Sequence, residues 1–282
     1  MSDNSAIEWT DATWNPVTGC TEVSPGCDHC YARTFAERWR DIPGHYFERG
    51  FDVVLRPEKV GLPLTWRRPR RVFVNSMSDL FHQQVPDEFI AEVFAVMAGT
   101  PQHTYQLLTK RHGRMRSLLR DPEFRTLVQV EAATLAQEGV DMRGPSNPWD
   151  AWPLRNVWLG VSVEDQQRAN MRIPALIETP ACLRWLSCEP LLGPVDLADA
   201  DPDATGDGGI DWVVTGGESG LGARPADAEW VRLLRDQCTE SDIPFFFKQW
   251  GGRTPKAGGR ALDGRTWDEF PPATPAPVAG NR

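Results

Sequence analysis

Val72-Phe73-Val74-Asn75-Ser76 is a short run rich in β-branched and aromatic residues, and residues 104–108 form a second such run. Between them, residues 86–97 carry apolar side chains at helical spacing along one face. A strand, a helix and a second strand in this order indicate two parallel strands joined by a crossover helix. This stretch therefore predicts an α/β fold with a parallel sheet.

The same alternation continues along the chain. Short strand-like runs recur at residues 157–161, 183–187, 212–215 and 245–247, each bounded by polar, Gly or Pro residues. Helical patterns cover residues 114–138, 164–177 and 226–238. With a further short strand at 13–17, the chain holds about six or seven strand–helix units, which predicts a partial or complete parallel βα barrel of the TIM type.

We expect two parts along the chain. Residues 1–252 form the barrel, and residues 253–282 form a C-terminal segment. Within that segment, an Asp-Gly pair at 263–264 with apolar flanks predicts a hairpin that folds back as a small cap over 262–270. The Pro- and Ala-rich residues 271–282 are expected to be disordered, and residues 140–152 to form a loop insertion.

Composition and charge argue against a membrane protein, a secreted protein and a protein drawn to nucleic acid by its overall charge. The chain has 282 residues, of which 40% are hydrophobic, and a net charge of -9, so no overall positive field draws it to nucleic acid or to anionic membranes. The N-terminus lacks a basic-then-apolar signal pattern, and no apolar run reaches the roughly 18 residues that a membrane span needs. We expect a cytoplasmic protein without a membrane partner.

Three cysteines lie close together in Gly19-Cys20-Thr21-Glu22-Val23-Ser24-Pro25-Gly26-Cys27-Asp28-His29-Cys30-Tyr31. Their thiolates can converge on one metal centre, but a structural zinc site normally has four protein ligands. His29 as the fourth ligand gives a Cys3His zinc site. The alternative is an iron–sulfur cluster in which three cysteines leave one iron open for a substrate or cofactor. The residues alone are compatible with both the zinc site and the iron–sulfur cluster.

The other three cysteines lie elsewhere in the chain. Cys182 and Cys188 flank an apolar run at even spacing, so in a strand they face the same side and are interpreted as small buried residues. Cys188 ends its strand beside Glu189, where a thiol could face a cavity, and it is the one candidate catalytic residue. Cys238 lies on a helical pattern and is expected to be structural.

Polar side chains follow every expected strand. In an α/β fold the active face lies at the carboxyl ends of the strands, so these residues are predicted to line one site. They occupy positions 75–79, 109–111, 162–165, 188–190, 216–219 and 248–250.

With a cysteine cluster after the first strand of a βα barrel, the chain resembles the radical S-adenosylmethionine (SAM) superfamily. It resembles especially a family of phage-type proteins named for a three-Cys motif of this spacing. That resemblance covers nearly the whole chain and includes Cys-Tyr-Ala at 30–32, Ser-Asp-Leu-Phe at 78–81 and Glu-Pro-Leu-Leu-Gly at 189–193. The wider superfamily usually has a shorter first gap than the six residues between Cys20 and Cys27.

The resemblance implies a [4Fe–4S] cluster on Cys20, Cys27 and Cys30, with SAM on the open iron. Reductive cleavage of SAM would give a deoxyadenosyl radical that abstracts hydrogen from a substrate in the barrel mouth. The electron would come from a donor such as flavodoxin or ferredoxin. These expectations describe an enzyme whose substrate the sequence does not identify.

The resemblance also suggests residues for SAM. Gly216, Gly217 and Glu218 look like the superfamily's Gly-Gly-Glu ammonium-binding motif, although here they follow a late strand, so a contact to adenine or ribose or a plain turn are the alternatives. Ser76 and Asp79 are alternative ammonium partners. Ser162 and Glu164 could serve the ribose and the carboxylate, and Lys110 or Arg111 could pair with a carboxylate or a phosphate.

Two basic runs bear on the substrate. Residues 66–71 join a tryptophan to four arginines, and residues 110–116 hold a second basic run. An aromatic residue among arginines suits stacking and phosphate contact, so a nucleic-acid or nucleotide component is the predicted substrate. The alternative is two solvated loops paired with acidic residues. The competing function is a zinc-stabilised module that binds nucleic acid or protein without catalysis.

Overall fold

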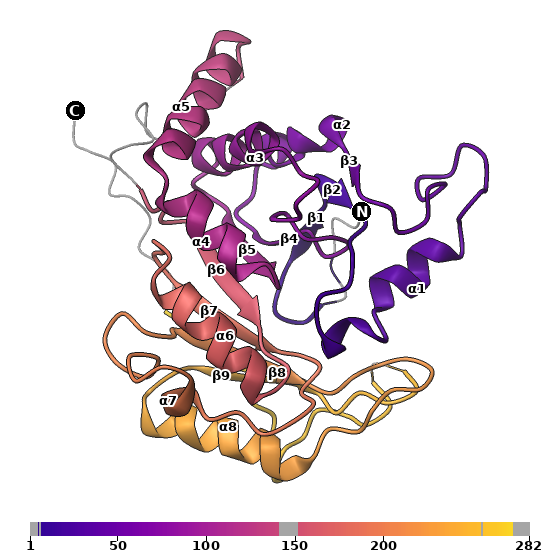
Figure 1. Ribbon diagram of the computed structural model, residues 1–282, viewed down its shortest axis with the longest axis vertical. Helices are drawn as coiled ribbons and strands as arrows, with labels where there is room; N and C mark the ends of the chain where they lie inside the picture. The colour runs from indigo at the N-terminus through magenta and orange to yellow at the C-terminus, as the bar shows by residue number, and fades with distance from the viewer. Residues whose placement is uncertain (1–4, 6, 141–151, 255, 273–282) are drawn as a thin grey trace.

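A computed structural model describes residues 5, 7–140, 152–254 and 256–272. Its centre is a seven-stranded sheet with the strand order β1-β4-β5-β6-β7-β8-β9, and every neighbouring pair is parallel (Figure 1). The sheet curls into a half-barrel with β1 and β9 at its edges, which confirms the predicted α/β class and a partial barrel. Its strands are β1 (Ala12–Trp14), β4 (Arg71–Val74), β5 (Thr104–Thr109), β6 (Val157–Ser162), β7 (Arg184–Cys188), β8 (Trp212–Gly216) and β9 (Phe245–Gln249).

The first predicted strand is shorter than expected. β1 ends at Trp14, and after Pro16 the chain forms β2 (Val17–Thr18), which pairs antiparallel with β3 (Val54–Leu55). This small ribbon leads directly to Cys20.

Helices follow most of the central strands. They are α1 (Tyr31–Glu37), α2 (Pro57–Val60), α3 (Asp87–Gly99), α4 (His112–Arg120), α5 (Pro122–Gln137), α6 (Gln166–Ile177), α7 (Leu197–Ala200) and α8 (Ala228–Glu240), with short 3-10 turns at Pro25–Cys27 and Leu62–Thr65. α1 stands to one side of the sheet, apart from the helices that follow β5, β6 and β8 (Figure 1).

The single helix predicted over 114–138 is two helices, α4 and α5. The break falls at Asp121 and Pro122, because Pro lacks the N–H of a helix interior and holds the residue before it in an extended conformation. Asp121 caps the new helix by accepting a hydrogen bond from the backbone N–H of Glu123 at 2.8 Å.

Two cores pack the opposite faces of the sheet. The larger contains the inward faces of the helices. The smaller contains strand residues and chain flanking the strands but no helix, and it is dominated by aromatic side chains. Its members include Trp9, Phe73, Trp158, Trp185, Trp212 and Phe246. Four of the twelve tryptophans therefore fill the face of the sheet that no helix covers.

The chain turns at Asp263 and Gly264, within the predicted cap segment. Asp263 and Gly264 both have positive φ, as the Asp-Gly turn requires, and Leu262 bridges Arg265. The chain then returns along β9, where the N–H of Phe247 donates to the carbonyl of Trp267 at 2.9 Å. This contact covers the edge of the sheet. Most of the predicted disordered segment 271–282, namely 273–282, and most of the predicted insertion 140–152, namely 141–151, lie outside the described residues.

No helix in the described part of the chain is long and apolar enough to cross a membrane.

Candidate functional site

The three clustered cysteines lie on a loop of residues 20–30, here called the Cys loop. It begins after Gly19, whose φ of +84° and whose approach to Asp52 exclude a side chain: a Cβ there would lie 1.9 Å from the Asp52 carbonyl oxygen. It ends at Cys30, the N-cap of α1. Three strand ends of the main sheet contact the Cys loop, so the loop lies across the carboxyl edge of the sheet.

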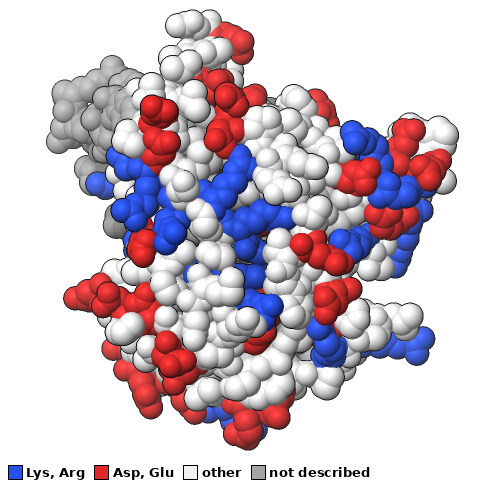
Figure 2. All heavy atoms as spheres, in the orientation of Figure 1, with Lys and Arg blue, Asp and Glu red and all other residues white. Residues whose placement is uncertain are grey.

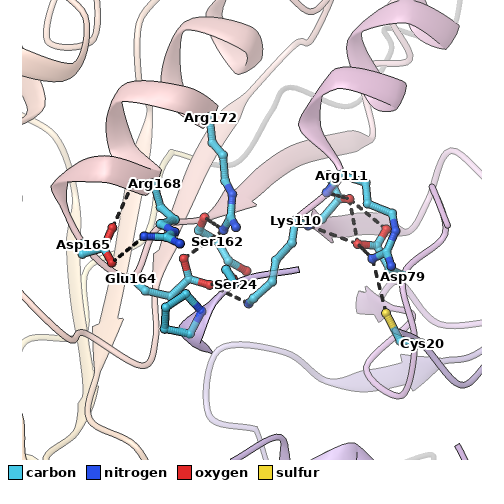
Figure 3. Close-up of polar contacts among 12 residues, drawn as sticks. Cys20, Ser24, Asp79, Lys110, Arg111, Ser162, Glu164, Asp165, Arg168 and Arg172 are labelled. Atoms are coloured by element: carbon cyan, nitrogen blue, oxygen red, sulfur yellow. Dashed lines mark hydrogen bonds and ion pairs between the residues drawn. The ribbon is translucent and has the colours of Figure 1, made fainter. Parts of the chain in front are cut away.

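The first contact joins Cys20 to the end of β5. Arg111 donates from Nη1 to Cys20 Sγ at 3.3 Å and from Nη2 to the carbonyl of Thr21 at 3.1 Å. Asp79 forms an ion pair with Arg111 at 3.3 Å, which holds Arg111 in place (Figure 3). Asp79 also accepts a hydrogen bond from the Thr109 hydroxyl at 2.8 Å. Burial, and then the charge of Asp79, raise the pKa of Cys20 to about 11 in spite of Arg111. A metal centre that binds this sulfur as thiolate would have to displace the proton.

The second contact joins the middle of the Cys loop to the end of β6. Glu164 is fully buried, and it accepts a hydrogen bond from the Ser24 hydroxyl at 2.7 Å. It also pairs with Arg172 at 2.9 Å and Lys110 at 3.3 Å (Figure 3). Burial alone would raise the pKa of Glu164, but Lys110 and Arg172 lower it, so the group is a carboxylate. Gly26 packs on it so closely that a Cβ would lie 2.4 Å from Glu164 Oε1.

The third contact joins the end of the Cys loop to the chain after β8. Glu218 lies 2.7 Å from His29 Nδ1 and 2.6 Å from Arg224 Nη2. Arg224 also donates to the Pro25 carbonyl at 2.8 Å and to Asp28 at 3.1 Å. Burial of Glu218 raises its pKa, but the hydrogen bonds from Arg224 and His29 outweigh burial and lower it to about 2.

The predicted acidic site residues are thus brought to one edge, where they hold the Cys loop. Glu164 and Glu218 are hydrogen-bonded to residues of the Cys loop, Ser24 and His29. Asp79 accepts a hydrogen bond from Arg111, which in turn contacts Cys20. Their oxygens are engaged before any ligand binds. In the structure these carboxylates therefore serve to hold the loop that carries the three cysteines.

The remaining predicted cofactor residues lie at the same edge. Ser76 bonds to the Asn15 amide at 3.2 Å, and Ser162 is buried with its carbonyl accepting from Arg172 at 2.6 Å. Gly217 approaches a neighbouring backbone: a Cβ there would lie 2.0 Å from the Trp250 carbonyl oxygen. Gly216 lies beside the ion pair of Glu189 and Lys248, whose oxygen and nitrogen are 2.5 Å apart. A Cβ on Gly216 would lie 3.5 Å from Lys248 and 3.6 Å from Glu189, so a small side chain would fit there.

Asn75 is a further polar residue at this edge. It follows β4 with a φ of +60° and is 4% exposed, yet neither its side-chain nitrogen nor its side-chain oxygen has a hydrogen-bond partner. A buried amide with no partner destabilises a protein, so it favours a ligand or water at this point.

Cys188 ends β7 as expected, but its side chain is buried in the helix-side core and burial raises the pKa of its thiol. It has no access to a substrate there. Cys182 precedes β7, packs against the tryptophan-rich core and so does not share a face with Cys188. Cys238 is buried, as predicted.

The donor set of the Cys loop fits an iron–sulfur cluster in its chemistry. Cys20, Cys27 and Cys30 are partly exposed and form no disulfide. Arg111 offers a hydrogen bond to one sulfur, a contact that tunes such clusters. In the ranges that the structure describes, however, no group of three or more His, Cys, Asp or Glu side chains is arranged to hold a metal ion.

The basic runs are largely paired. Lys and Arg gather in the middle of the face in Figure 2, with Asp and Glu more frequent around them. In the second run, Lys110, Arg111, Arg114 and Arg116 pair with Glu164, Asp79, Asp87 and Glu178. In the first, Arg71 pairs with Asp11, and Arg70 lies over Trp66 with its guanidinium carbon 4.9 Å from the ring centroid. These contacts favour the alternative of loops paired with acidic residues.

Sequence reasoning missed Arg224, which holds Glu218 and two residues of the Cys loop. Arg224 lies six residues after Glu218, beyond the strand end itself, and a lone Arg in a Gly-rich stretch gives no signal. The pair of Glu189 and Lys248 could have been found, because both residues lie directly at predicted strand ends.

Comparison with curated proteins and with solved structures found no match. The sequence profile of one family, described as "Protein of unknown function (DUF5131)", matches residues 4–271. This match includes the Cys loop, all seven strands of the main sheet and the contacts at their carboxyl ends. The chain therefore belongs to the DUF5131 family.

Proposed function

We propose that this protein is a radical SAM-type enzyme that holds a [4Fe–4S] cluster on Cys20, Cys27 and Cys30. The observation that carries the proposal is the attachment of the Cys loop, at three points, to the carboxyl edge of a parallel half-barrel. Ligand sites of α/β folds lie at this edge. A loop with three thiols and no disulfide at such a place supports a metal centre in the active site.

The bound cluster and SAM would supply one-electron chemistry that removes a hydrogen atom from a substrate. The protein's part is to position the thiols and to keep the site dry. Arg111 would position Cys20 and stabilise negative charge on its sulfur. The tryptophan-rich core excludes water from the sheet face that no helix covers.

Asp79, Glu164 and Glu218 act in this proposal as positioning residues for the Cys loop. The residues that would contact SAM are the other predicted ones, Ser76, Ser162, Gly216 and Gly217. The amide of Asn75, which has no hydrogen-bond partner, would be a further contact. An electron donor such as flavodoxin or ferredoxin would reduce the cluster, and a nucleic-acid or nucleotide component remains the proposed substrate.

One observation favours the competing zinc module. His29 is hydrogen-bonded through Nδ1 to Glu218, and zinc-binding histidines commonly hold a carboxylate on the nitrogen that does not bind the metal. His29 Nε2 would then be the fourth ligand beside three thiolates.

Metal and sulfide analysis after anaerobic purification separates the two functions. A cluster gives about four irons and four sulfides per chain, and Cys20→Ser, Cys27→Ser or Cys30→Ser each removes them. Cys182→Ser, a partly buried cysteine outside the Cys loop, is the matched control and keeps the metal. His29→Gln keeps the iron of a cluster.

The contrary result is about one zinc per chain, no sulfide, and loss of the zinc in His29→Gln. That outcome would replace the enzyme with the binding module. Iron and sulfide that do not depend on the three cysteines would also overturn the proposal.

A further inference from the structure

We propose that a cavity beside the Cys loop binds a nucleobase. The cavity has a volume of about 420 Å³, within the range of pockets that take small ligands. It lies among the ends of β1 and β4, α1 and the chain after α1, and is here called the aromatic cavity. Its lining residues are Thr13, Asn15, Thr18, Phe35, Trp39, His45, Tyr46, Phe47, Ser76 and Met77.

Aromatic rings form much of its lining. Trp39 stacks on His45 with ring centroids 4.1 Å apart and ring planes 16° apart. Phe47 packs edge-on against Phe35, with centroids at 5.6 Å, and against Tyr46 at 4.9 Å. Flat apolar surfaces of this kind suit a planar ring, because every base has a π-face that stacks on aromatic side chains.

Among the described residues that line it, none is Asp, Glu, Lys or Arg. The part of a ligand that enters is therefore uncharged, since a buried charge would have no partner. The polar lining residues are Asn15, Thr13, Thr18 and Ser76, which carry an amide and three hydroxyl groups. A neutral planar heterocycle with donors and acceptors on its edge matches both sides of the cavity.

Tyr46 is a fixed part of the wall. The Arg56 guanidinium carbon lies 4.0 Å from the centroid of its ring, and Arg56 also donates to the Tyr46 carbonyl at 2.5 Å. The Tyr46 hydroxyl is shut off from solvent, so a ligand in the cavity would meet the ring of Tyr46 and not its hydroxyl.

The aromatic cavity is preformed. Glu37 at the end of α1 accepts two hydrogen bonds from Arg40, at 2.5 and 2.7 Å, and one from the N–H of Phe51 at 3.0 Å. These bonds fix both ends of the segment that carries the aromatic residues. A fixed segment loses little conformational freedom when a ligand binds.

The position links the aromatic cavity to the cysteines. The Tyr31 hydroxyl donates to the carbonyl of Ser76, a lining residue, at 2.6 Å, and Tyr31 directly follows Cys30. If the proposed function holds, the base belongs to the substrate and lies next to the metal centre. The binding itself does not depend on a cluster.

Calorimetric titration of the metal-free full chain with adenosine, guanosine, cytidine and thymidine tests this inference. We expect saturable binding of at least one nucleoside at one site per chain. Phe35→Ala and Trp39→Ala should each weaken that binding about tenfold or more, since each removes a ring on which a base can stack.

Leu233→Ala is the matched control. Leu233 is 39% exposed, close to the 37% of Trp39, and it lies on α8, outside the lining of the aromatic cavity. It should leave nucleoside binding unchanged.

Two results would overturn the inference: no binding of any of the four nucleosides, or binding that Phe35→Ala and Trp39→Ala leave unchanged. Because the titration uses metal-free protein, its failure is separate from a failure to assemble a cluster. Nucleoside binding in a protein that never binds iron would leave this inference standing and remove the proposed function.

Discussion

Replacing Glu164 with Gln tests how the Cys loop is held. Glu164 is fully buried, and its carboxylate pairs with Arg172, whose side chain is 4% exposed, and with Lys110. The substitution keeps the shape of the side chain but leaves the buried Arg172 charge without its counter-ion. Breaking a buried pair costs about 3–5 kcal/mol, and we expect the free energy of unfolding of Glu164→Gln to fall by that amount.

Glu178→Gln is the matched control. Glu178 also pairs with two arginines, Arg116 at 3.0 Å and Arg120 at 3.4 Å, but its side chain is 51% exposed. Exposed ion pairs contribute about 0–1 kcal/mol, so this substitution should hardly change stability. Urea unfolding followed by tryptophan fluorescence measures both variants. Equal losses in the two variants would refute the reasoning.

The same variant has a local effect that a second measurement can follow. Ser24 donates to Glu164, and Gly26 packs on it, so the Cys loop should open more readily when the carboxylate is gone. Amide hydrogen exchange should therefore accelerate in residues 20–30 more than in α5, which packs mainly against α3. Acceleration spread evenly over the chain would show that Glu164 stabilises the fold without holding the Cys loop.

Three further predictions follow from the same contacts. The pKa of Glu218 is lowered from 4.5 to about 2, so its contribution is present above pH 4.5 and is lost as the pH falls toward 2. The stability difference between wild type and Glu218→Gln should shrink by about 3 kcal/mol over that range, and a difference independent of pH would contradict the assignment. Gly26→Ala should cost about 1–3 kcal/mol through its collision with Glu164, whereas Gly113→Ala, with open space around its Cβ in α4, should stabilise by about 0.5–1 kcal/mol; denaturant midpoints compare them. Gly217→Ala should destabilise the protein more than Gly26→Ala, because its Cβ would meet a backbone oxygen, and thermal unfolding that ranks the two in the opposite order would argue against this.

The arrangement of the sheet could be predicted from the sequence because each strand and its following helix are local patterns. The strand runs and the helical faces appear within a dozen residues of one another, and the parallel order follows from their alternation. The division into α4 and α5 could also have been predicted. Pro122 is visible in the sequence and interrupts a helix by a known mechanism.

The role of the strand-end carboxylates could not be predicted in the same way. Sequence position indicates that Glu164 and Glu218 lie at the active edge, but their partners Ser24 and His29 are 140 and 189 residues away in the chain. Nothing local distinguishes a carboxylate that binds a ligand from one that holds a loop. The aromatic cavity was missed for a related reason, since it combines α1, which the sequence analysis did not predict, with the ends of β1 and β4.

Cys188 shows a limit of strand-end reasoning. Residues that end a parallel strand alternate between the two faces of the sheet. Cys188 points to the helix-bearing face, where the core buries it. The strand-end position alone could not distinguish that face from a cavity.

Electron paramagnetic resonance of the reduced protein, with and without SAM, tests the central claim most directly. The account predicts a reduced [4Fe–4S] signal in wild type that SAM shifts, because one iron is free to bind it, and no such signal in Cys20→Ser, Cys27→Ser or Cys30→Ser. Cys182→Ser should keep both the signal and the shift. A reconstituted protein that gives no iron–sulfur signal, or a signal that SAM leaves unchanged, would contradict the claim that these three cysteines hold a cluster with an open iron.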